Sequence, residues 1–360
     1  MNAIVGYFNR ATSKMKLGEG VIRAIGSIIA IILAMSLGAI IIALSGINPF
    51  FAYAELFKSA FGTLYSVGEI LVRSMPLGFT ALAFAIAFRG GLVNIGGEGQ
   101  FYIGALGATL AALFFPNLSP WILIPLSLLS AIVFGAIWGA IPGFLKAKWN
   151  VNEFVNTVLM NYIAIYLVDF LVGGPIREGI SHSNPQTVLL AKASWLPILI
   201  PQTRVNLGFV IMILLTIVMY VFLWKTPLGY QIRVIGHNPK AGNYAGINRF
   251  FITILNLGIA GAIAALGGAV QILGIQHRLI ANFSPGYGYK GIAVALLGRN
   301  NPFGVLIAAI FLAALETGSR GMESFTGVSF YLIDAIEALI LIFILSSDYL
   351  AGRYLFKKVV

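Results

Sequence analysis

The stretch GGLVNIGGEGQFYIGA (residues 90–105) places five glycines, Asn94, Glu98 and Gln100 within eleven residues, between two apolar runs. Glycine weakens a helix because of its backbone freedom, and polar side chains are costly to bury in hydrocarbon unless they are hydrogen-bonded. The stretch therefore either ends a helix or lines a polar cavity.

The composition is that of a membrane protein. The chain has 360 residues, of which 59% are hydrophobic and 10% are charged, whereas soluble domains carry about 25% charged residues. Runs such as residues 24–44 are long enough to cross a bilayer, which takes about 20 apolar residues. They lack the alternation of barrel strands. We expect an all-α polytopic membrane protein. The absence of cysteine excludes disulfides and thiolate metal sites.

Hydropathy predicts about ten membrane segments, some of them short or broken, at 21–46, 76–89, 99–115, 120–145, 153–173, 206–224, 252–275, 289–298, 303–317 and 327–347. With the N-terminus in the cytoplasm, fifteen Lys and Arg residues fall on the cytoplasmic side and eight on the outer side. This bias follows the positive-inside rule, and it explains the net charge of +11 better than nucleic-acid binding does. Both termini are then cytoplasmic.

The chain is expected to be one transmembrane domain (1–360) with two pseudo-symmetric halves, about 21–173 and 206–347, joined by an outer loop at 174–205. Residues 96–114 resemble 284–298, because in both a Gly-x-Gly precedes a short helix of small residues. Five segments in each half would invert the second relative to the first, as in many transporters. The aromatic stretch 47–75 is expected to contain an amphipathic helix at the membrane interface.

The run 76–89 would be only about 21 Å long as a helix, less than the hydrocarbon core of about 30 Å. The loop at 90–99 is therefore expected to lie partly within the membrane, buried in protein or facing a water-filled cavity. Two interpretations of Glu98 are open: it lines that cavity, or it stabilises the N-terminus of helix 99–115. No Walker A pattern occurs, so the glycines do not form a nucleotide loop.

Four ordered stretches carry a family resemblance: residues 90–105, GFLKAKWNVNEFVNTVLMNYIA (143–164), the run 226–270, and GYGYKGIAVALLGRNNPFGVLIAAIF (286–311). They resemble permease subunits of ATP-binding-cassette importers of the ribose, nucleoside and branched-chain amino acid type, closest to the subgroup for nucleosides and simple sugars. The resemblance implies a transport subunit without enzymatic activity in the bacterial cell (inner) membrane. Its implied partners are a second, homologous permease chain, a cytoplasmic ATPase that binds the ATP and Mg, and an extracytoplasmic substrate-binding lipoprotein. It implies no cofactor in this chain, with a nucleoside as the first choice of solute and a simple sugar as the second.

Two sets of site residues follow. The loop 225–251 is either a solvated basic loop or, as the resemblance implies, the surface that couples to the ATPase; its motif residues are Gly229, Arg233, Gly236, Asn238, Ala241, Gly246 and Ile247. Amides and aromatics inside spans either join helices or contact a sugar or base. The candidate substrate path consists of Asn94, Glu98, Gln100, Phe101, Tyr102, Asn156, Asn161, Gln271 and Tyr289.

One rival class remains open. Asp334 and Glu337 are three residues apart on the last predicted span, so they share a helix face and could relay protons or cations in an ion-driven secondary transporter. An intramembrane enzyme is disfavoured, because neither H-E-x-x-H nor G-x-S-x-G occurs.

Overall fold

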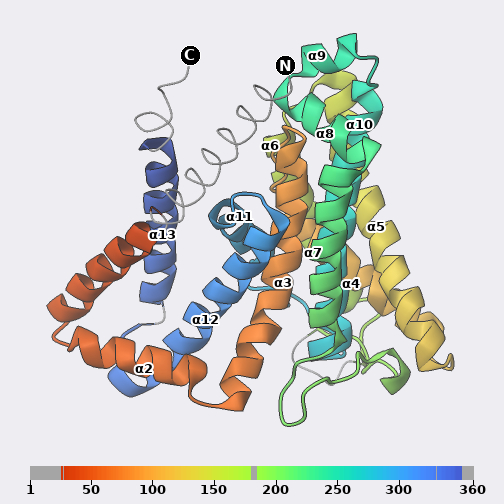
Figure 1. Cartoon of the computed structure of the whole chain (residues 1–360). Helices are drawn as coiled ribbons and strands as arrows, with labels where there is room; N and C mark the ends of the chain where they lie inside the picture. Colours follow the sequence, from red (N-terminus) through yellow and green to blue (C-terminus); the bar gives the residue numbers. More distant parts are fainter. Residues whose placement is uncertain (1–25, 27, 180–184, 330, 351–360) are drawn as a thin grey trace, which may run out of the picture. The chain divides into compact units, whose positions relative to one another are not determined.

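The computed structural model describes residues 26, 28–179, 185–329 and 331–350 (Figure 1). Within these residues the secondary structure is helical, with two isolated β-bridges, Gln186 to Ile280 and Ile198 to Asn206. Some basic residues in the topology argument lie outside the described part: Arg10, Lys14, Lys16, Arg23, Arg353, Lys357 and Lys358. The chain forms two compact units, residues 63–314 and residues 1–62 with 315–360.

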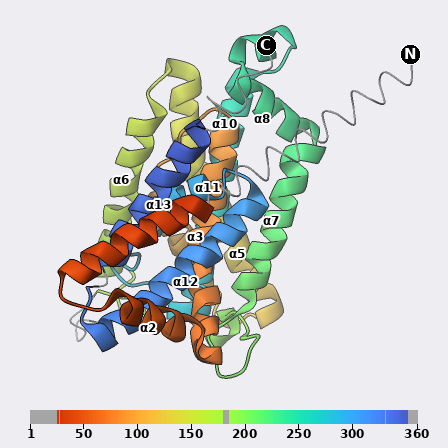
Figure 2. The ribbon, with the colours of Figure 1, turned by 60° about the vertical axis from the view of Figure 1, so that its left-hand side comes forward.

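The larger unit is built from long and short helices, with a long connection between Gly173 and Leu207. Its helices are α3 (Leu64–Arg89), α4 (Gly97–Phe114), α5 (Pro120–Trp149), α6 (Glu153–Gly173), α7 (Leu207–Lys225), α8 (Pro227–His237), α9 (Pro239–Tyr244), α10 (Arg249–Gln271), α11 (Tyr287–Leu297) and the first part of α12 (Pro302–Thr326). A π-helical turn, Ile272–Gln276, extends α10. Figure 2 shows α6 and α7 on opposite sides of α3.

Small residues bring α10 against α5. A Cβ added to Gly261 would lie 2.2 Å from the carbonyl oxygen of Gly135, and one added to Gly139 would lie 2.3 Å from that of Leu257. Both distances are far below van der Waals contact, so only glycine allows this approach. Close backbone packing through small residues is the usual way in which membrane helices associate. The contact fixes α10 as the centre of the unit, between α5, α4 and α3.

The prediction of a short segment at 76–89 is wrong. Helix α3 begins at Leu64 and has 26 residues, about 39 Å at 1.5 Å per residue, which is enough to span. Residues 64–75 therefore belong to this helix and not to the interfacial stretch 47–75. Pro76 lies inside the helix. The loop after Arg89 is nevertheless buried, with Leu92 and Asn94 at 7% and 2% exposure.

The smaller unit contains the helix Ile28–Leu44, α2 (Pro49–Phe61), the end of α12 and α13 (Tyr331–Leu350). The first two helices meet at a bend of 119°, and the Tyr53 hydroxyl donates to the carbonyl of Met35 at 2.6 Å. One face of α2 is buried, through Ala52, Leu56 and Ala60. This is the arrangement expected of an amphipathic helix.

Among the described residues, six helices are long and apolar enough to cross a membrane, or seven if the bent pair is one span. This confirms an all-α polytopic membrane protein. The count of ten segments and the inverted halves stay predictions, and the two compact units do not coincide with those halves.

Candidate functional site

The loop between α3 and α4 is held by its own polar side chains. The Asn94 side-chain amide donates to Gln100 Oε1 at 3.0 Å, and Asn94 Oδ1 accepts from the backbone N–H of Gly96 at 3.0 Å. Asn94 and Gln100 are 2% and 1% exposed. The two predicted path residues thus satisfy each other in this conformation, as buried amides must.

Helix α6 supplies the second set of contacts to this loop. Asn161 Oδ1 accepts from the Gly99 N–H at 2.7 Å, and its amide donates to the Ile95 carbonyl at 2.9 Å. The Thr157 hydroxyl accepts from the Ile95 N–H at 3.2 Å. Asn161 is therefore brought together with the loop. Asn156, also on α6, differs: its buried side-chain nitrogen has no hydrogen-bond partner among the described residues.

Glu98 joins the first turns of two helices. It lies in the first turn of α4 and is 2% exposed, and its Oε2 accepts from the Gly288 N–H of α11 at 2.6 Å. A Cβ on Gly288 would lie 2.1 Å from the Glu98 backbone nitrogen, so only glycine permits this approach. Since helix N-termini carry partial positive charge, a carboxylate between two of them is well placed. The carboxylate thus stabilises the start of α11 in addition to that of its own helix.

The aromatic path candidates divide into a buried group and an exposed one. Phe101 stacks on Phe283 with ring centroids 5.6 Å apart, and Tyr102 lies 4.6 Å from the same ring. Tyr289 is 40% exposed, and the Asn161 amide reaches its hydroxyl at 3.3 Å. Gln271, 8% exposed, ends α10 just before the π-helical turn. Of the three aromatic path candidates, Tyr289 is therefore the exposed one.

The expected coupling residues lie on two short helices, α8 and α9, and in the turns that follow each of them, at one end of the larger unit called here the α8–α9 end (Figure 1). Thr226 caps α8 by accepting from the Gly229 N–H at 3.1 Å, and Asn238 caps α9 by accepting from Ala241 N–H at 3.1 Å. Gly246 has a φ of +74°, which favours glycine. Ile247 packs on a small core formed by Ile232, Ile235 and Ile252. The motif residues thus shape a compact pair of helices.

Gly236 connects this pair to the loop after α3. A Cβ at Gly236 would lie 2.2 Å from the carbonyl oxygen of Arg89 and 2.9 Å from the backbone of Gly91, which has a φ of +72°. The two backbones are therefore in direct contact. Two cavities of about 370 and 360 Å³ lie on either side of this contact, and both are lined by Gly91 and Gly236.

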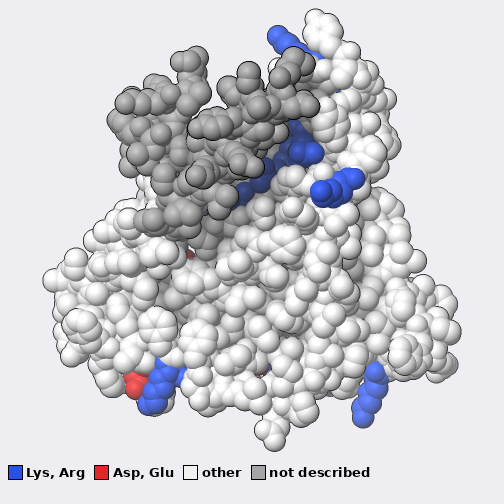
Figure 3. All heavy atoms as spheres, viewed as in Figure 1, with Lys and Arg blue, Asp and Glu red and all other residues white. Residues whose placement is uncertain are grey.

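Basic side chains surround these cavities. Lys146, Lys148 and Arg249 line the first, and Arg89 and Arg299 line the second. On the face drawn in Figure 3, Lys and Arg side chains lie near the α8–α9 end and at the opposite end, with an almost uncharged surface between them. Charged ends on either side of an uncharged surface are typical of a membrane permease.

The sequence matches known transport proteins over most of its length. The family model of the branched-chain amino acid transport system permease component matches residues 66–345. The chain belongs to this permease family. It is 37% identical to the nucleoside ABC transporter permease protein NupB of Lactococcus lactis over 325 residues, covering 88% of this chain and 89% of that protein. The guanosine ABC transporter permease protein NupP of Bacillus subtilis is 34% identical over 325 residues, covering 89% and 92%. The glucose ABC transporter permease protein TsgB13 of Haloferax volcanii is 34% identical over 332 residues, covering 89% and 87%.

These findings confirm the resemblance drawn from the motifs: the chain is a multi-pass membrane permease component of an ABC transporter. The individual roles of the path and coupling residues stay predictions.

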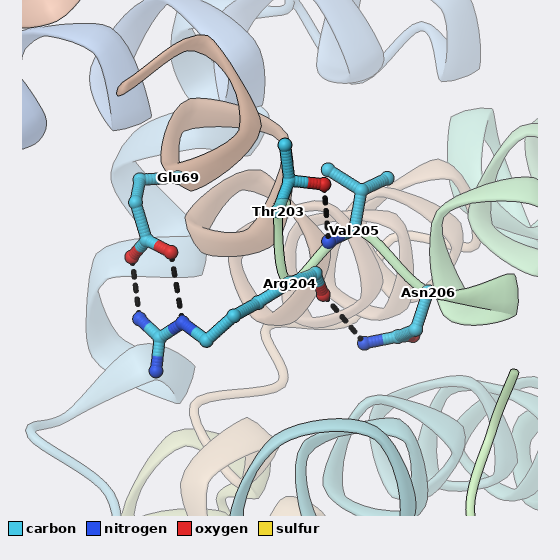
Figure 4. A network of polar contacts seen from close by, with 5 residues as sticks. All are labelled: Glu69, Thr203, Arg204, Val205 and Asn206. Carbon is cyan, nitrogen blue, oxygen red and sulfur yellow. Dashed lines mark hydrogen bonds and ion pairs between the residues drawn. The ribbon is translucent and has the colours of Figure 1, made fainter. Parts of the chain in front are cut away.

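The opposite end of the permease holds an ion pair that the sequence analysis missed. Arg204 Nε and Nη2 donate to the two carboxylate oxygens of Glu69 at 2.8 and 2.5 Å (Figure 4). Glu69 is 6% exposed and lies on α3, whereas Arg204 lies in the connection to α7. The sequence does contain a signal for this pair: Glu69 lies in an apolar run, and a charge in such a run needs a partner.

The same connection is tied to the π-helical turn. Asn206 accepts from the Gly208 N–H at 2.9 Å, which caps α7, and its amide donates to the Gly274 carbonyl at 3.1 Å. Nearby, His277 stacks on Trp195 with ring centroids 3.9 Å apart. The outer loop expected at 174–205 is thus anchored to the end of α10, apart from residues 180–184, which are not described.

Proposed function

We propose that the permease imports a small polar, neutral solute by alternating access, driven by a separate ATPase that docks on α8 and α9 at the cytoplasmic face. The observation that carries this proposal is the backbone contact between Gly236 and the Arg89–Gly91 turn. A displacement of α8 acts directly on that turn. The turn leads within a few residues to Asn94 and Glu98, so the docking surface and the candidate path share one short piece of backbone.

The basic residues around both cavities support a cytoplasmic position for the α8–α9 end. A nucleoside is the solute we favour, since two of the relatives are named for nucleoside or guanosine transport; a sugar is second, from the glucose permease. The exposed Tyr289 ring suits stacking on a base or sugar face. An extracytoplasmic binding protein and a second permease chain complete the proposed assembly.

The test is uptake by vesicles that contain the permease with its ATPase and binding protein. Gly236→Ala is expected to lower nucleoside uptake at least tenfold while ATP hydrolysis continues, because the added methyl separates α8 from the Arg89 carbonyl. Arg233→Ala should uncouple in the same way. Gly173→Ala is the matched control, since nothing lies within 4 Å of its added Cβ.

Normal uptake with Gly236→Ala would overturn the coupling assignment. Uptake by the permease alone, driven by an ion gradient and lost in the double variant Asp334→Asn with Glu337→Gln, would replace the proposal with a secondary transporter. Competition by unlabelled uridine, guanosine and glucose assigns the solute class; competition by none of them would overturn the choice of solute.

A further inference from the structure

The first of the two cavities has an uneven charge. It lies between the end of α5, the start of α10 and the α8–α9 pair, and its volume is about 370 Å³. Lys146, Lys148 and Arg249 line it, and Glu153 is the only carboxylate among its lining residues, all of which are described. Glu153 pairs with Lys146 at 2.9 Å. Lys148 and Arg249 therefore leave an excess positive charge facing the cavity.

An aromatic cluster borders this cavity. Phe144 meets Trp149 edge-on with centroids 5.6 Å apart and meets Phe250 at 6.0 Å. Phe250 itself lines the cavity. Trp149 is 58% exposed and Phe250 is 44% exposed. Large exposed aromatics at the end of spanning helices lie at the boundary between headgroups and acyl chains.

Lys148 links the aromatic cluster to the cavity. Its Nζ lies 4.7 Å from the centre of the Trp149 ring and 5.4 Å from that of Phe144. A lysine at this boundary keeps its alkyl stem on apolar surface and its ammonium among polar groups. The cation is thus held over the aromatic cluster at the edge of the cavity.

We propose that this cavity binds the headgroup of an anionic phospholipid. The phosphate lies between Lys148 and Arg249, and an acyl chain runs over Phe144, Trp149 and Phe250. Basic pockets between spanning helices at the cytoplasmic surface are suited to such headgroups. Placing this lipid in the cytoplasmic leaflet rests on the orientation proposed above; the rest of the proposal does not. An acidic segment of a soluble partner fits less well, because it would leave the aromatic cluster without an apolar contact. Since Gly236 and Pro239 also line the cavity, a bound lipid would contact the α8–α9 pair.

The experiment measures retained lipid by native mass spectrometry of the purified permease, titrated with phosphatidylglycerol or phosphatidylcholine of the same chains. The wild type is expected to retain phosphatidylglycerol at least tenfold more strongly. The double variant Lys148→Gln with Arg249→Gln should lose that preference. The control is the double variant Lys225→Gln with Lys240→Gln, which removes the same amount of charge from residues that do not line the cavity. This control should keep the preference for phosphatidylglycerol. Transport is not measured, so failure of the proposed function leaves this result unaffected.

Four outcomes would overturn the proposal. Equal retention of the two lipids shows that the cavity does not select an anion. Equal loss in both double variants shows attraction by diffuse surface charge. The cavity lysines can also be acetylated in the presence of either inorganic phosphate or phosphatidylglycerol. If inorganic phosphate protects them as strongly as phosphatidylglycerol does, the cavity is a site for a soluble anion. A separate arm adds the ATPase: if the Lys148 and Arg249 variant releases that partner and still prefers phosphatidylglycerol, the cavity holds protein instead of lipid.

Discussion

Glu69 and Arg204 form a two-armed ion pair that joins the first part of α3 to the residues preceding α7, 135 positions later in the chain (Figure 4). The two partners differ in burial, because the Glu69 side chain is 8% exposed and the Arg204 side chain is 49% exposed. The pair therefore ties the connection before α7 to α3, and the cost of losing each partner is unequal.

We expect Arg204→Met to destabilise the permease by about 2 kcal/mol, since it leaves a buried carboxylate without its charged donor. Glu69→Met should cost about half as much, because the exposed guanidinium can turn to water. The double variant should be more stable than Arg204→Met alone. Thermal unfolding in detergent measures all three; equal effects of the two single variants would contradict the pair's asymmetry.

Asn161 and Asn156 provide a matched comparison on one helix. Asn161→Leu removes an acceptor for Gly99 and a donor for Ile95, and should cost about 2–4 kcal/mol because both backbone groups are left buried and unsatisfied. Asn156→Leu should change stability by less than about 1 kcal/mol, since the amide nitrogen that it removes has no partner among the described residues. Thermal unfolding gives the stabilities, and uptake is measured in parallel. If Asn156→Leu is as unstable as Asn161→Leu, the hydrogen-bond assignment is wrong.

Glu98 can be tested by separating its charge from its geometry. Glu98→Gln keeps an acceptor oxygen for the Gly288 N–H, whereas Glu98→Leu removes it. Glu98→Leu should therefore lower the unfolding midpoint by several degrees more than Glu98→Gln does. Uptake lost in Glu98→Gln without loss of stability would assign the charge to transport. Equal unfolding midpoints for the two variants would contradict the link between α4 and α11.

The sequence predicts well where a helix is uninterrupted and locally capped. The segment expected at 206–224 is observed at Leu207–Lys225, because an apolar run follows Asn206, whose side chain caps the helix. Expected segment 153–173 coincides with α6 for the same reason, with Asn152 as its cap. Local residues alone determine these ends.

Sequence patterns do not predict a structural feature that depends on a residue far away in the chain. The start of α3 was missed because Glu69 and Pro76 interrupt its apolar run, and the partner that makes Glu69 tolerable is Arg204. In the site, the motif located the loop after α3 correctly, but the acceptor role of Glu98 depends on Gly288, which is 190 positions away. Such contacts arise only from tertiary packing.

His277 makes the stability of the permease sensitive to pH. Burial lowers the pKa of His277 from its ordinary value of 6.5, and its ring stacks on Trp195. Because the unfolded chain then binds a proton more readily than the folded one, stability is complete above about pH 6.5 and falls as the pH drops below it. We expect the unfolding midpoint to fall between pH 7.5 and pH 5.5, and His277→Asn, which tolerates the positive φ of this position, to reduce that fall. An identical slope in wild type and His277→Asn would show that this histidine does not titrate with unfolding.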